Sequence, residues 1–324
     1  MLEKEYLSTY RAGKNYKALA LGEIPNWGWH LKDIKSECLS EVTVVFNWNL
    51  VRTSTFALLP ALIAHEAIRE QLWIDYATVK DGGSLTSDLA KYAITPMTKS
   101  MDAEFARLVK AYRSTDEETL KALLEVIGME FVENSVPTSR AVAIGVEVVF
   151  ESVIRESWTA FEELVRELWV ATLDNDDGTV GGRAAGVVRK PSKKITPTFN
   201  MKTHLGSYQV ETRQVVFQRF EDITTFYGAA FGPTVAAVFR DSEAGYIRVL
   251  YAFRNVLVHK RGKADATFRE QVASYPEFNK IKDGEQIVLD GEHTRKMRDA
   301  AMIVGRKLVE LADKELQRQK EQSV

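Results

Sequence analysis

The sequence predicts an all-α protein, and three observations lead to that prediction. Apolar side chains recur every three or four residues along most of the chain, as they do on the buried face of an amphipathic helix. Only FNKIKDGEQIVLD, at residues 278–290, is interpreted as strands, forming a small β-hairpin that turns at Asp283–Gly284. With 324 residues, 45% of them hydrophobic, the chain can bury a substantial core.

Residues 1–140 are expected to form an N-terminal, mainly helical domain of unknown role. Helical periodicity runs over residues 53–83 and again over 87–112, and a third helix opens at Ser114. The apolar run VTVVFNW at residues 42–48 fits either a strand or the start of a helix, and both interpretations stay open.

Residues 141–324 are expected to form a second helical domain. Gly245 is a weak point where a predicted helix can kink or divide. Residues 178–208 form a basic loop, because they contain several Lys and Arg residues and no Asp or Glu. The predicted helices span residues 143–173, 211–231, 234–260 and 292–319.

Composition and motifs exclude several classes of protein. The net charge of −2 gives no overall attraction to nucleic acid, and a single cysteine, Cys38, excludes an internal disulfide framework. No two of the five histidines have metal-site spacing, and no dinucleotide or phosphate-loop motif occurs, so we expect no metal and no cofactor. The chain lacks a signal-peptide core and a membrane span, so we expect a cytoplasmic protein that does not bind membranes.

The segment YAFRNVLVHKRGKAD places three polar side chains inside an apolar helical run. Burying Arg254, Asn255 and His259 costs free energy unless they are paired or used. On a helix, Asn255 and His259 share a face, and the long side chain of Arg254 can reach round to it. Together they can act on a phosphodiester, with a guanidinium to hold the phosphate, an imidazole to transfer a proton and an amide to orient the group.

This pattern, Arg254-Asn255-Val256-Leu257-Val258-His259, resembles the motif of the HEPN superfamily of α-helical domains. Its nuclease members carry Arg, a polar residue, three more residues and then His. The following KRGKADATF and the last amphipathic helix fit the same family, and ESWTAFEELVREL resembles its first core helix, in which Glu162 would face the motif. The resemblance covers about residues 143–319 and implies a HEPN-like helical bundle with metal-independent endoribonuclease activity.

The resemblance also implies roles for residues and partners. His259 would transfer protons, Arg254 would stabilise the phosphorane, and Asn255 and Glu162 would orient the site. Because HEPN nucleases bring two motifs together, it implies a homodimer, and by analogy a toxin or phage-defence effector with an antitoxin or regulatory protein. Contacts to the RNA substrate are assigned to the cations Lys260, Arg261, Lys190, Lys193 and Lys194.

Other interpretations of the same residues stay open. The domain can be a non-catalytic HEPN-type module that binds RNA, a nucleotide or a protein, or a scaffold in which the motif is structural. Arg254 and His259 can stabilise a helix end through a carboxylate and the helix dipole. Asn255 can satisfy backbone groups, and Glu162 can pair with Arg254 or Arg166.

Overall fold

The structure is a computed structural model that describes residues 34–54, 139–191, 204–240 and 245–322. Within these ranges the regular structure is helical, with one isolated β-bridge and no sheet, so the predicted all-α class is confirmed. The chain divides into two compact units. Most described residues belong to the unit made of Pro25–Ser54, Phe150–Leu289 and His293–Val324. No helix in the described ranges combines the length and apolar character needed to cross a membrane.

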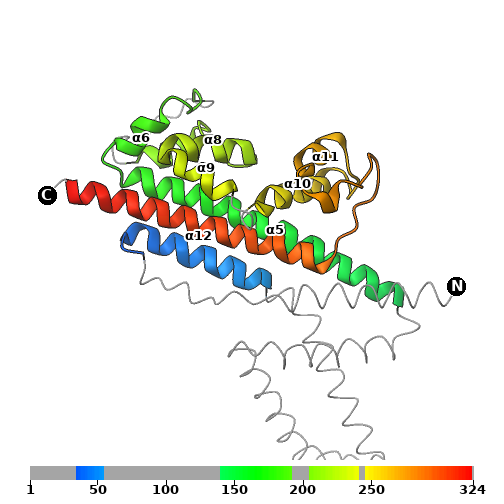
Figure 1. Cartoon of the computed structure of the whole chain (residues 1–324). Helices are drawn as coiled ribbons and strands as arrows, with labels where there is room; N and C mark the ends of the chain where they lie inside the picture. Colours follow the sequence, from blue (N-terminus) through cyan, green and yellow to red (C-terminus); the bar gives the residue numbers. More distant parts are fainter. Residues whose placement is uncertain (1–33, 55–138, 192–203, 241–244, 323–324) are drawn as a thin grey trace, which may run out of the picture. The chain divides into compact units, whose positions relative to one another are not determined.

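Two long helices, α5 (Ser139–Asp174) and α12 (Gly291–Gln322), run side by side (Figure 1). Both were predicted, and their observed ends lie within a few residues of the expected ones. Each helix buries an apolar stripe, and each large side chain removed from water contributes about 1.5–3 kcal/mol. The fully buried residues of these stripes include Val153, Phe161, Leu168, Met297, Val304 and Val309.

A third helix, over residues 37–54, packs against α5 and α12. Gly305 of α12 allows the close approach, because an added Cβ would lie 2.5 Å from the Phe46 ring and 2.7 Å from Leu164 Cδ2. The start of the helix is tied to α12 by Ser36 N, which donates to Asp313 Oδ1 at 2.7 Å. The run VTVVFNW is therefore helical, and this helix belongs to the same compact unit as most of the C-terminal half.

The remaining predictions for the first 140 residues lie outside the described residues. These are the part after Ser54 of the helix expected over residues 53–83, the helix expected over residues 87–112 and the helix expected from Ser114. The domain boundary near residue 140 therefore stays a prediction.

Shorter helices connect the two long ones and differ in part from the prediction. The helix expected over residues 211–231 begins only at Phe220, because Arg213 adopts a left-handed conformation with φ 56° and the backbone is irregular up to that point. The helix expected over residues 234–260 is divided, and Gly245 is the N-cap of its second part. The observed helices are α7 (Leu205–Glu211), α8 (Phe220–Phe231), α9 (Pro233–Arg240) and α10 (Tyr246–His259).

The predicted β-hairpin over residues 278–290 is wrong. Gly284 does form the expected turn, with φ 77° and Glu285 N donating to Lys282 O at 3.1 Å. The segment after the turn, however, pairs with the residues that follow α10, through the isolated bridge between Lys263 and Gln286. The pairing partner comes from a segment about twenty residues earlier in the chain, and the local turn signal could not reveal it.

The prediction of an irregular basic loop over residues 178–208 is wrong at both ends. Residues Thr179–Ala184 form α6, and α7 begins at Leu205. The acidic end of α5 anchors both helices: Asp176 accepts hydrogen bonds from Val180 N and Gly181 N, and Asp174 accepts one from Gly206 N at 2.7 Å. Residues 192–203, with Lys193 and Lys194, lie outside the described residues.

Candidate functional site

The RNVLVH motif occupies the last two turns of α10. This helix forms because its apolar residues fit the core; Leu250, Phe253 and Val256 are buried. It ends where Lys260 N and Gly262 N both donate to Val256 O, at 2.9 and 3.1 Å. Gly262 has φ 75°, a left-handed conformation that favours glycine, and a Cβ there would also force the Gln286 amide to move.

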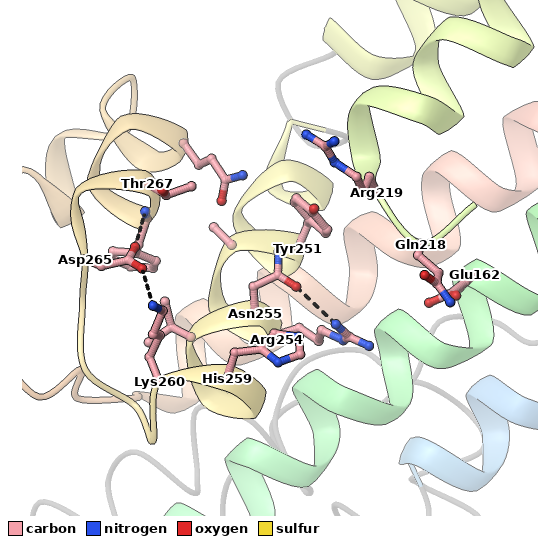
Figure 2. A pocket seen from close by; sticks show the side chains of 14 residues that line it. Glu162, Gln218, Arg219, Tyr251, Arg254, Asn255, His259, Lys260, Asp265 and Thr267 are labelled. Atoms are coloured by element: carbon pink, nitrogen blue, oxygen red, sulfur yellow. Dashed lines mark hydrogen bonds and ion pairs between the residues drawn. The ribbon is translucent and has the colours of Figure 1, made fainter. Parts of the chain in front are cut away.

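A pocket of about 610 Å³ lies beside the end of α10 (Figure 2). Four parts of the chain line it: α5, the segment before α8, α10, and α11 (Ala266–Val272). The predicted site residues Glu162, Arg254, Asn255 and His259 all contribute to its wall, together with Lys260. The fold therefore brings Glu162, about ninety residues earlier in the chain, to the motif of α10.

The guanidinium of Arg254 is oriented by its neighbour. Its Nη1 donates to Asn255 Oδ1 at 3.1 Å, and both side chains are half-buried. No carboxylate in the described ranges lies within ion-pair distance of Arg254, so the alternative of a helix-end ion pair is not observed there. A guanidinium with most of its donors unused can accept an anionic ligand in a bidentate manner.

Glu162 reaches the pocket from α5 and is held by Trp158. Trp158 Nε1 donates to Glu162 Oε2 at 3.0 Å, and the Trp158 ring packs against Tyr251 of α10 with centroids 4.9 Å apart. Burial raises the pKa of Glu162 above its ordinary value, against the lowering effects of the Trp158 hydrogen bond and the charge of Arg254. Arg166 pairs with Glu167 at 2.8 Å instead of with Glu162.

His259 and Lys260 stand at the mouth of the pocket, and both are exposed. Lys260 Nζ lies 3.6 Å from Asp265 Oδ2, and Asp265 Oδ1 accepts a hydrogen bond from Phe268 N at 2.8 Å, which caps α11. This cap is packed firmly, because Phe268 is buried with its ring centroid 5.1 Å from that of Phe253. The α11 wall is therefore fixed relative to the motif.

No family model, curated protein or solved structure matches the chain. The HEPN resemblance therefore stays a prediction.

The polar residues of the motif all line the pocket, but most of the predicted RNA-binding cations that the structure describes do not. Of those that lie in the described ranges, only Lys260 lines the pocket. Arg261 is exposed in the turn after α10, with φ 53°, and is not part of the pocket wall. Lys190 is exposed after α6 and lies outside the wall as well, while its neighbour Arg189 is paired with Asp222 at 2.6 Å.

Sequence reasoning missed part of the wall. Asp265 had a usable signal, since an aspartate that directly precedes a short helix is a common N-cap. The other missed residues had none, because they are polar side chains in unremarkable sequence that only tertiary packing brings to the motif. These are Gln218, Arg219, Thr267 and Gln271.

The pocket combines groups suited to an anion and to proton transfer. Arg219 and Arg254 supply guanidinium groups, His259 an imidazole and Glu162 a carboxyl group. In the described part of the chain no cluster of three or more His, Cys, Asp or Glu residues is placed to hold a metal ion. Guanidinium and imidazole groups are donors that can contact a phosphate directly.

Proposed function

We propose that the protein is a metal-independent endoribonuclease of the HEPN type. The observation that carries this proposal is the wall of one pocket, in which Arg254, with no carboxylate partner among the described residues, lies with His259 and Glu162. A guanidinium free to bind an anion, beside an imidazole able to transfer a proton, is the minimum that phosphodiester cleavage by the substrate's own hydroxyl requires.

In the proposed reaction the 2'-hydroxyl of one nucleotide attacks the adjacent phosphorus. An imidazole removes the hydroxyl proton, the new P–O2' bond forms as the P–O5' bond breaks, and the leaving 5'-oxygen takes up a proton. The products are a 2',3'-cyclic phosphate and a 5'-hydroxyl. Arg254 stabilises the charge that develops on the phosphorane, and Asn255 holds the guanidinium in place.

Glu162 has a supporting role in this proposal. Its carboxyl group is held by Trp158, and its electrostatic influence reaches Arg254 across the pocket. Glu162 therefore lines the same pocket as Arg254 without forming a direct ion pair with it, and leaves the Arg254 donors available to the phosphate.

Among the described residues, one imidazole lines this pocket, that of His259, whereas the reaction needs a base and an acid. We therefore propose a homodimer in which two copies of α10 meet across a two-fold axis, so that one His259 acts as base and its mate as acid. RNA is the proposed substrate, and an antitoxin or another regulatory protein is a proposed partner.

The test is cleavage of RNA by the purified protein in EDTA. We expect activity to survive EDTA, and end-group analysis to give cyclic phosphate and 5'-hydroxyl termini. Substrates with 2'-O-methyl or deoxyribose at the cut site should be inert, because the attacking hydroxyl is absent. Products with a 3'-hydroxyl, or strict dependence on added magnesium, would contradict the mechanism.

A second candidate is a non-catalytic module of the same type that binds RNA, a nucleotide or a protein. If the chain is a monomer, the single imidazole that the described residues contribute to the pocket favours this candidate. In that case the protein should bind RNA without cleaving it under any of the conditions above.

A further inference from the structure

The pocket has two chemically different sides. The anion-binding side contains Arg254 and His259, whereas α11 contributes the neutral side chains of Thr267 and Gln271. These two residues are four positions apart and so lie on one face of α11. Figure 2 shows Thr267 on one side of Asn255, with Arg219 and Glu162 on the other.

Core residues also contribute to the pocket wall. Ala252, Val256 and Phe268 line the pocket and are otherwise buried. A wall that combines apolar atoms with hydrogen-bonding groups suits a nucleobase, in the way that single-stranded RNA is recognised by proteins.

The hydrogen-bonding groups of the α11 wall are available to a ligand. Neither the Gln271 amide nor the Thr267 hydroxyl makes a hydrogen bond to any residue in the described ranges. A glutamine amide presents a donor next to an acceptor and can pair with the edge of a base in a bidentate manner. The capping bond at Asp265 and the packing of Phe268 against Phe253 fix where these groups stand.

We infer that Gln271, assisted by Thr267, is a specificity-determining residue that recognises the base of a nucleotide flanking the phosphate bound at Arg254. This inference rests on the proposed ribonuclease function. It adds that the enzyme cleaves at a preferred base, since a phosphate held at Arg254 brings a neighbouring base within reach of the α11 wall of the same pocket.

The experiment uses hexanucleotides with a single ribose in a 2'-O-methyl background, so that one linkage is cleavable. The two bases that flank this linkage are varied one at a time among A, C, G and U. Wild type should cleave the preferred base about tenfold faster than the others, the discrimination of one bidentate amide–base pair. Gln271→Leu should lose this preference and cleave the substrates with different bases at similar rates. Gln271→Glu, which keeps the shape but removes the amide donor, should change which base is preferred.

Glu270→Leu is the matched control, because Glu270 is an exposed neighbour on the same helix that does not line the pocket. It should keep the wild-type preference. A Gln271→Leu variant with an unchanged melting temperature and an unchanged order of bases would overturn the inference and leave the proposed function intact.

Binding separates the two ideas further. The same substrates are titrated onto the His259→Ala variant and followed by fluorescence anisotropy. If wild type cleaves nothing but binding depends on the base through Gln271, base recognition stands and the nuclease function fails. If binding is independent of the base and of Gln271, the inference fails whatever the cleavage result.

Discussion

Replacing His259 by alanine should separate catalysis from folding. His259 is exposed, and no hydrogen bond or ion pair joins it to a described residue. The structural contribution left to it is a favourable interaction with the helix dipole, which is about 0.3–1 kcal/mol. Losing this interaction should lower the melting temperature of a chain of this size by at most about 4 °C. Proton transfer, in contrast, contributes about 10²- to 10⁴-fold to the rate, or about 3–5 kcal/mol in the barrier.

The assay is single-turnover cleavage of a labelled RNA in EDTA, with RNA binding and thermal melting measured on the same preparations. We expect at least a hundredfold loss of rate, with binding within a few-fold of wild type. His204→Ala is the control, because His204 is another exposed histidine at a helix end and lies outside the pocket wall. Equal rates for the His259 variant and wild type would refute the catalytic role. A loss of rate that follows a large fall in melting temperature would instead assign His259 to helix stability.

Three further predictions follow from the same structure. Glu162→Gln should raise the melting temperature at pH 7 but not at pH 4: its raised pKa makes ionisation unfavourable in the folded state, so stability is lost as the pH rises through that pKa. A lower melting temperature for this variant at pH 7 would refute the reasoning. Gly262→Ala should destabilise the protein by about 1–2 kcal/mol in denaturant titrations, since Gly262 has positive φ and contacts Gln286; no change in midpoint would mean that the turn tolerates a side chain. Light scattering should give about twice 36.6 kDa, and a monomer at micromolar concentration would count against the two-motif mechanism.

The sequence by itself determined the all-α class and the two long helices. Apolar periodicity is a local property, and over more than thirty residues in α5 and α12 it is strong enough to override single exceptions. Short elements were harder to predict, because a short segment contains too few apolar residues to establish a period. Val215 and Phe217 fall within the span 211–231 that was expected to be helical and are buried, but they lie in irregular backbone, because burial is required of them and helical geometry is not.

The candidate site divides in the same way. The sequence alone singled out Arg254, Asn255 and His259, because polar side chains in an apolar helix need a partner or a use. The resemblance added Glu162, and the described fold places it in the same pocket.

Only the tertiary structure decided what faces the motif. The residues Gln218, Thr267 and Gln271 reach the pocket because α8 and α11 pack where their buried aromatic residues fit, and that choice depends on contacts between segments distant in the chain. The pairing of Lys263 with Gln286 arose in the same way. A local sequence pattern reports the conformational preference of its own segment. Which other segment it packs against is set by the free energy of the whole core.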